Sequence, residues 1–351
     1  MILPASHVTV FILLIFGMLC WGLWANTFKA TGPKWRFELF YFDFAIGTVI
    51  AALVLALTAG SLGFDGFSFL DDIRLAGKRQ DLFAFIAGAV FNLGNMLLLA
   101  ALSVTGMSIA FPLALGFALI IAGFWNFALN PGGNLIFMSI GAVVLLGAVV
   151  LGAMAAKAAT VAIPAAAVAG TATTVKTKSR KKSSLKSVFL SLAGGLLLGS
   201  FSPLVQMARA GDNGLGPYSS GFIFAVGIVF STFVFNLFFM NLPVQGEPID
   251  IADYFRAKFR WHALGFLGGI LWYCGTLAVL VAGKLDPPAG VEASLSYGIP
   301  QGGIVIAGLC GLMLWKEFDS AEASIKIRVG MMLVLVVLGL GLSAASLASA
   351  P

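Results

Sequence analysis

The sequence predicts an all-α membrane protein with ten transmembrane helices, arranged as two inverted five-helix repeats. Sixty per cent of the 351 residues are hydrophobic and only 10% are charged, whereas roughly 25% of the residues in an average soluble domain are charged. The 42 glycines suit helices that pack closely in lipid. Finally, apolar runs of about 20 residues, the length that spans hydrocarbon, recur along the chain.

The first five runs are separated by charged residues, prolines or glycine clusters. They predict spans at Val8–Phe28, Phe40–Gly60, Leu82–Ser103, Met107–Leu129 and Leu135–Ala156. The first run is longer than the apolar core of a signal peptide and lacks its basic start and a clear small-residue cleavage site, so we expect a retained membrane helix. Residues 1–156 form the predicted first repeat.

A basic segment, 157–187, joins the two repeats. It is rich in Ala, Thr, Ser and Lys and has no apolar period, which is typical of a flexible linker. The stretch from Gly170 to Thr177 is similar to a phosphate-binding loop, but Val175 stands where the second glycine is needed and no strand precedes it. We therefore expect neither a nucleotide nor any other cofactor.

The second repeat, 188–351, contains five further apolar runs. They predict spans at Val188–Ala208, Tyr218–Met240, His262–Gly283, Pro288–Leu314 and Val329–Ala348. A shift of 181 residues aligns Phe85, Gly88, Phe91 and Gly94 with Phe266, Gly269, Trp272 and Gly275. Because five is an odd number, the repeats cross the bilayer in opposite senses, and the substrate site is expected between them near the midplane.

The lysines and arginines predict the orientation in the cytoplasmic membrane. Sixteen of the 21 lie in the first, third, fifth, seventh and ninth connections, and basic loops stay in the cytoplasm. We therefore place the central linker in the cytoplasm and both termini outside. Arg74, Lys78 and Arg79 depart from this rule in the second connection, where four aspartates surround them. The basic residues act as topology signals, and a nucleic-acid partner is not expected.

The cysteines and histidines indicate no metal site and no disulfide. Cys20, Cys274 and Cys310 all fall inside apolar runs, where cysteine acts as a small buried hydrophobe. His7 and His262 have no partner at metal-ligand spacing. We expect structural roles for both histidines near the membrane surface.

Polar side chains inside the spans are the candidates for substrate binding, because burying them in lipid is costly. Trp21, Trp24 and Asn26 place two indoles and an amide at the end of the first span, although an aromatic belt at the membrane surface is the alternative. Asn92 and Asn95 stand three residues apart on one helical face and could hold one polar ligand. Their alternative role is hydrogen bonding to a neighbouring helix.

The second repeat offers matching candidates. Tyr273 and Thr276 occupy positions related to the two asparagines and are also polar. Ser296, Tyr297 and Gln301 lie in the ninth span around a proline that can free a carbonyl group by breaking the helix.

Two acidic residues are the candidates for proton coupling. Glu292 lies more than a turn inside the ninth span, and a carboxyl group that is costly to ionise in hydrocarbon is a natural proton carrier. A structural glutamate near the external mouth is the alternative. Asp43, in the second span, is the other candidate, and its alternative is a cap or an ion pair with Lys34 or Arg36.

Several short motifs resemble the drug/metabolite transporter superfamily and, within it, the ureide permease family and its bacterial relatives. They are Gly22–Trp24, Tyr41, Asp43, Gly94–Asn95, Gly106, Ser108, Asn126 and Ser202–Pro203. The resemblance implies ten spans, a cytosolic central loop, and proton-coupled import of allantoin or an oxo-heterocycle such as uracil. It also adds Asn126 to the substrate-binding candidates. Phe111 departs from the family pattern, since it stands where the plant proteins carry an acid.

The sequence therefore predicts a secondary transporter that imports a small polar metabolite by alternating access, with a proton and the lipid bilayer as further partners and a homodimer left open. The rhamnose and glucose/ribose uptake families share the ten-span pattern, so sugar uptake is the alternative. A membrane-embedded enzyme or scaffold is the alternative of another class, but no Ser-His-Asp set or paired carboxylates lie near a membrane surface. A channel would need rings of like charge or a filter loop.

Overall fold

The computed structural model describes residues 1–129, 133–162, 175–283, 295, 298–319 and 321–348, and within these ranges the chain is helical without strands. Nine of the described helices are long and apolar enough to cross a membrane. The expected class, an all-α membrane protein, is therefore confirmed. The nine spans are His7–Thr31, Phe37–Leu57, Lys78–Thr105, Met107–Leu129, Leu135–Ala158, Leu185–Arg209, Pro217–Asn241, Phe259–Ala282 and Ala323–Leu347.

The tenth span remains a prediction. The sequence places it at Pro288–Leu314, but 288–294, 296 and 297 lie outside the described residues. The described remainder is a shorter apolar helix, Gly298–Leu314. The inverted repeat, which needs the tenth span, is a prediction for the same reason.

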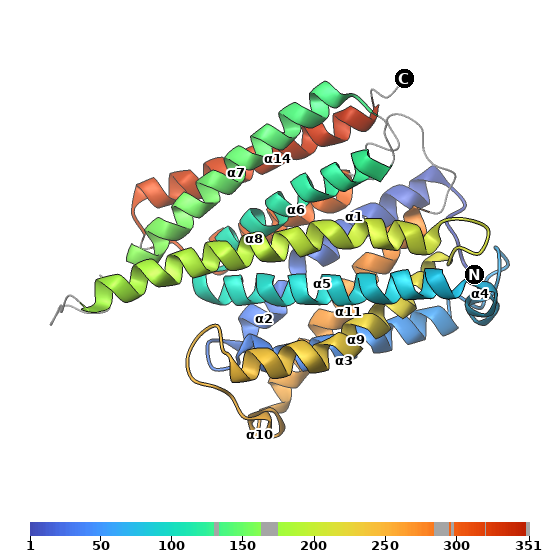
Figure 1. Cartoon of the computed structure of the whole chain (residues 1–351), viewed down its shortest axis with the longest axis horizontal. Coiled ribbons are helices and arrows are strands. Elements are labelled where there is room, and N and C mark those ends of the chain that lie inside the picture. The colour runs from blue at the N-terminus through green and yellow to red at the C-terminus, as the bar shows by residue number, and fades with distance from the viewer. Residues whose placement is uncertain (130–132, 163–174, 284–294, 296–297, 320, 349–351) are drawn as a thin grey trace. The chain divides into compact units, whose positions relative to one another are not determined.

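The elements follow one another as Figure 1 labels them. In the first part of the chain they are α1 His7–Leu23, α2 Ala25–Thr31, α3 Phe37–Leu57, α4 Phe69–Leu75, α5 Lys78–Thr105, α6 Met107–Leu129 and α7 Leu135–Ala162. In the second part they are α8 Val175–Arg209, α9 Pro217–Asn241, α10 Ile251–Phe255, α11 Phe259–Ala282, α13 Gly303–Leu309, the π-helix η1 Cys310–Leu314, and α14 Ala323–Ala348.

The two described ends of the predicted linker, 157–187, are helical. The helix α7 continues to Ala162, and α8 begins at Val175, so the lysine-rich residues 176–186 start a helix. Lys, Arg, Leu and Ser tolerate helical backbone well, and the apolar run that follows supplies a helix for them to extend. Residues 163–174 lie outside the described residues.

The chain divides into two compact units that do not follow the two sequence halves. Unit 1 contains Met1–Leu93 and Ser200–Gly303, and unit 2 contains Gly94–Gly199 and Ile304–Pro351. The boundaries fall inside α5 and α8, so each unit takes helices from both predicted repeats.

Unit 1 is built around α3, which packs against α11 and α9, while α1 packs on the other side of α11. Glycines allow α3 and α11 to approach backbone to backbone. A Cβ atom at Gly269 would lie 2.0 Å from the carbonyl oxygen of Phe44, and one at Gly47 would lie 2.2 Å from that of Phe266. Such contacts give membrane helices their packing energy when water cannot drive association.

Unit 2 is built around α7, which packs along α14 and against α6. The helix α6 begins directly after Gly106, whose φ of +86° suits glycine. The carboxylate of Glu317 accepts hydrogen bonds from the backbone N–H groups of Met107 and Ser108, both at 2.8 Å. It thereby caps the first turn of α6 with a negative charge, as the helix dipole favours.

Candidate functional site

The end of the first span carries the predicted Trp21, Trp24 and Asn26, and each has a different environment. Trp21 donates its indole N–H to the hydroxyl of Thr276 at 3.1 Å, which joins α1 to α11 within unit 1. Trp24 is buried against Phe44, with ring centroids 5.0 Å apart. Asn26 donates to the Leu23 carbonyl. The structure thus brings Trp21 and Thr276 together, and it buries Trp24 in the interior of unit 1.

Asn92 is fully buried and its amide is engaged by α9. Its Nδ2 lies 2.8 Å from the hydroxyl of Ser231, 3.1 Å from that of Thr232 and 3.1 Å from the Ile228 carbonyl oxygen. This is the helix-to-helix bonding named as the alternative role of this residue. Asn95 is buried in unit 2, and Asn126 is half-buried on α6 in the same unit.

Tyr273 is the most unusual of the predicted residues. Its side chain is fully buried in unit 1, yet its hydroxyl group has no hydrogen-bond partner among the described residues. The hydroxyl faces α9, since a Cβ atom at Gly221 would lie 2.7 Å from it. Leaving a buried hydroxyl unpaired costs roughly 1–3 kcal/mol, so a polar partner for this group would be stabilising.

The ninth span contributes less to the described site. Gln301 is half-buried on the described helical segment Gly298–Leu314. Glu292, Ser296 and Tyr297 lie outside the described residues.

Asp43 lies at the centre of a second polar cluster, which we call the Asp43 cluster: Asp43, Tyr254 and His262. Tyr254 of α10 donates its hydroxyl to Oδ1 of Asp43 at 2.6 Å. Nδ1 of His262, on α11, lies 3.1 Å from Oδ1 and 3.0 Å from Oδ2. Asp43 is thus paired, with a histidine rather than with Lys34 or Arg36. Arg36 instead binds the carboxylate of Glu38.

Sequence reasoning missed both partners of Asp43. His262 is 219 residues away from Asp43 in the sequence. Metal-ligand motifs have short, regular spacings, so they do not reveal one isolated His–Asp pair. Tyr254 lies on a five-residue helix with no apolar period. The sequence shows that His262 lies in the first turns of an apolar run, but the packing of that run against the span that contains Asp43 comes from the structure alone.

Aromatic rings enclose the Asp43 cluster. Trp35 stacks on Trp261 with centroids 5.2 Å apart, and it meets the His262 ring edge-on at 5.4 Å. Its indole N–H is buried and has no partner among the described residues. Burial, and next to it the hydrogen bond and negative charge of Asp43, raise the pKa of Tyr254 far above its ordinary value. Tyr254 therefore stays a hydrogen-bond donor throughout the physiological pH range.

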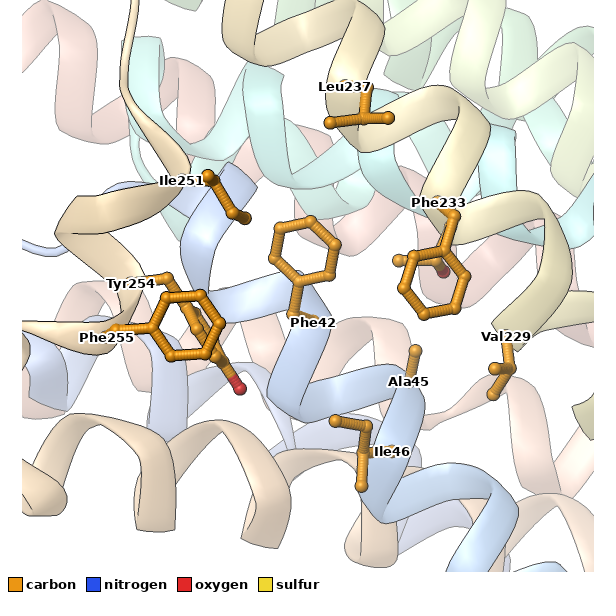
Figure 2. Close-up of a pocket in the computed structure, with 10 residues that line it drawn as sticks. Phe42, Ala45, Ile46, Val229, Phe233, Leu237, Ile251, Tyr254 and Phe255 are labelled. Carbon is orange, nitrogen blue, oxygen red and sulfur yellow. The ribbon is translucent and has the colours of Figure 1, made fainter.

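An apolar pocket of about 330 Å³ adjoins the cluster, between α3, α9 and α10 (Figure 2). Tyr254 forms part of its wall beside Phe255 and packs edge-on against Phe42, with centroids 5.5 Å apart. The lining residues are Phe42, Ala45, Ile46, Val229, Thr232, Phe233, Leu237, Ile251, Tyr254 and Phe255. Such a lining offers almost no hydrogen bonds and so does not suit a strongly polar solute.

The comparison with protein families decides the class of this protein. The model of the family described as "Sugar transport protein" matches residues 11–343. The chain belongs to this sugar transport family. It is therefore a multi-pass membrane transporter of small solutes rather than an enzyme, and the resemblance to sugar-uptake and ureide permease proteins is confirmed.

Relatives of this family member come from bacteria and plants. It is 23% identical to the "Putative ribose uptake protein RbsU" of Staphylococcus epidermidis, over 92% of this chain and 95% of the relative. It is 20% identical to Ureide permease 1 of Arabidopsis thaliana, over 87% of this chain and 88% of the plant protein. A solved crystal structure, described only as that of a protein, is 17% identical, covers 98% of both chains and has a TM-score of 0.52. That likeness concerns the fold alone.

Proposed function

We propose that this family member is a secondary importer of a small polar solute in the cytoplasmic membrane, with a pentose-type sugar such as ribose as the first candidate substrate. The family description and the ribose uptake relatives support this choice. A proton gradient is the proposed driving force, and alternating access between the two predicted repeats is the proposed mechanism. The central linker would lie in the cytoplasm and both termini outside.

The observation that carries the proposed binding site is the unpaired hydroxyl of Tyr273. A sugar hydroxyl could both donate to it and accept from it. Trp21 and Thr276 lie on the adjoining helices α1 and α11, and their hydrogen bond could open to serve a substrate. The indole face of Trp21 would then stack on the apolar face of a sugar ring. Trp24 would support this wall from behind.

The remaining predicted residues take secondary places in this proposal. Asn26 and Gln301 lie in unit 1 with Tyr273 and are the further candidates for the polar lining of this site. Asn95 and Asn126, in unit 2, stay separate predictions. Ser296 and Tyr297 lie outside the described residues and also stay predictions. Asn92 is fully used by α9 and would hold the helices rather than the solute. Asp43 and Glu292 are the acidic residues proposed to take part in proton coupling.

A ureide or oxo-heterocycle is the second candidate substrate, because the chain matches Ureide permease 1 across 87% of its length. Allantoin and uracil present carbonyl and N–H groups on a flat ring. Tyr273 could donate to such a carbonyl, and Trp21 could stack on such a ring. The two candidate substrates thus use the same residues, so uptake measurements are needed to distinguish them.

The experiment is uptake of labelled ribose, glucose, allantoin and uracil by cells expressing the chain, with and without a protonophore. The Tyr273→Phe variant should raise the KM for the transported solute about two- to tenfold, since one hydrogen bond is worth roughly 0.5–1.5 kcal/mol. The matched control is Tyr218→Phe, because the Tyr218 hydroxyl is already paired with the Ile2 carbonyl. Equal KM values in both variants would remove Tyr273 from the site, and silence for all four solutes would overturn the substrate classes.

A further inference from the structure

Three side chains from three separate elements converge near the amino-terminal end of α3. Asp43 comes from α3, Tyr254 from α10 and His262 from α11. The Asp43 side chain is 8% exposed, whereas that of His262 is 24% exposed. The carboxylate is therefore held away from solvent, and the imidazole in contact with it still has access to exchange protons.

Two neighbouring cations among the described residues have partners other than Asp43. Arg36 is bound to Glu38 and to the Glu247 carbonyl, and Lys258 lies over the ring of Trp261. The charged and titratable groups on the surrounding elements are Lys29 on α2, Glu38, Tyr41 and Asp43 on α3, Asp253 and Tyr254 on α10, Lys258, Arg260 and His262 at the start of α11 with Tyr273 and Cys274 further along it, and Lys34, Arg36, Glu247, Asp250 and Arg256 in the connections.

The geometry sets the place of a proton. Because Nδ1 of His262 faces both oxygens of Asp43, the neutral imidazole carries its hydrogen on Nδ1 and donates it to the carboxylate. The other ring nitrogen, Nε2, is then the acceptor for an incoming proton. With Tyr254 held as a neutral donor, the cluster carries one negative charge before protonation and none afterwards.

This change of charge matters because the cluster lies on two candidate membrane spans, α3 and α11. A net negative charge there is costly to remove from water, and a proton on His262 cancels it. We propose that the His262–Asp43 pair is the proton-binding site that couples transport to the proton gradient. This inference rests on the proposed proton-driven import and names the group that carries the proton, His262, with Asp43 as its counter-charge.

The packing around the pair also limits what moves when the proton leaves. The helices α3 and α11 lie close together here, since a Cβ atom at Gly265 would lie 2.6 Å from Cβ of Asp43 and 3.1 Å from the Phe40 carbonyl oxygen. Their contact leaves little room for sliding. The element with the weaker hold is α10, which has five residues, none of them buried, and reaches the pair through the Tyr254 hydroxyl. Proton release would therefore act first on the position of α10.

The first test reads proton binding without any substrate. Trp35 meets the His262 ring at 5.4 Å, and an imidazolium quenches a neighbouring indole, so tryptophan fluorescence of the purified protein should show a step when the pH is varied. His262→Gln should abolish the step. Asp43→Asn should alter the step, because the counter-charge of the imidazolium is lost. The matched control His7→Gln changes the other, exposed histidine and should keep the step.

The second test reads coupling in proteoliposomes, with labelled ribose or allantoin as the probe. The wild type should concentrate the probe under an inward proton gradient, whereas His262→Gln should lose this accumulation and keep exchange of labelled for unlabelled probe. A merely structural role would reduce both. An unchanged fluorescence step or full accumulation in His262→Gln would overturn the inference. A step that depends on His262 without transport of either probe would support the proton site and overturn the proposed substrates.

Discussion

Asn92 is a residue at which helix packing and substrate binding compete for one amide. Its Nδ2 has three acceptors on α9, but Ser231 and Thr232 also donate to the carbonyls of their own helix at 2.7 Å. Both hydroxyl groups would therefore keep an acceptor for their hydrogen after the amide is removed. A hydrogen bond between membrane helices contributes about 0.6 kcal/mol on average and at most about 1.7 kcal/mol.

The Asn92→Leu variant should consequently lower the melting temperature of the detergent-solubilised protein by a few degrees and leave KM unchanged. Leucine has the same number and branching of heavy side-chain atoms as asparagine, so the substitution removes the hydrogen bonds without opening a cavity. Asn241→Leu is the control, because its exposed amide bonds only to the Leu237 carbonyl of its own helix. A stable Asn92→Leu protein with a tenfold higher KM would assign the amide to the substrate instead.

Among single residues, sequence reasoning identified Asp43 and Tyr273 as important polar groups but could not supply their surroundings. A carboxylate in an apolar run is visible in the sequence because its burial is costly. Its partner His262 is not visible, since the contact depends on how α3 and α11 pack. Likewise, the buried hydroxyl of Tyr273 without a partner is a property of packing alone.

Among the elements, the α3–α11 contact depends on glycine more strictly than any apolar pattern indicates. A Cβ atom at Gly269 would lie 2.0 Å from the Phe44 carbonyl oxygen and 2.8 Å from the backbone nitrogen of Thr48. Neither is the end of a flexible side chain. A methyl group can fit only if the two helices move apart.

The Gly269→Ala variant should therefore be destabilised by about 1–3 kcal/mol, the usual cost of overpacking. At about 2–4 °C per kcal/mol, the melting temperature should fall by several degrees. Gly330→Ala, on α14, is the matched control, because nothing lies within 4 Å of its added Cβ atom and alanine favours the helix by about 1 kcal/mol. Equal melting temperatures for both variants would mean that α3 and α11 are not in such close contact.

The long helices were predictable and the short ones were not. The predicted Met107–Leu129 is found with the same bounds, and the eight other described spans lie within a few residues of their predictions, with the start of the last one six residues earlier. Lipid demands a continuous apolar run, which makes the signal strong. The short helices α4 and α10 lie in polar connections and start at serine or aspartate caps, Ser68 and Asp250. Their position depends on tertiary contacts.

For the whole molecule, hydrogen bonds within unit 1 join some connections to one another and so divide the connections into two groups. The amino group of Met1 donates to the Asp65 carbonyl in the α3–α4 connection, and the backbone N–H of Gly216 donates to Asp72 of α4. In contrast, Arg36 in the α2–α3 connection donates to the Glu247 carbonyl in the α9–α10 connection. The basic residues predict the same two groups, with the amino terminus outside and the first and seventh connections in the cytoplasm.

The orientation itself can be read by labelling single cysteines in a variant that lacks the three native ones. A membrane-impermeant maleimide should label Asp212→Cys, next to Gly216, in intact cells, and should reach Lys258→Cys only after the cells are permeabilised. Both side chains are exposed, so the difference reports sidedness rather than burial. The expectation rests on the excess of basic residues in the odd connections, because such loops are retained in the cytoplasm.

The reverse labelling would place the Asp43 cluster, which lies at the Lys258 end of α11, on the external face. Proton-driven import would then load His262 directly from outside, whereas the predicted orientation makes this cluster the point of proton release into the cytoplasm.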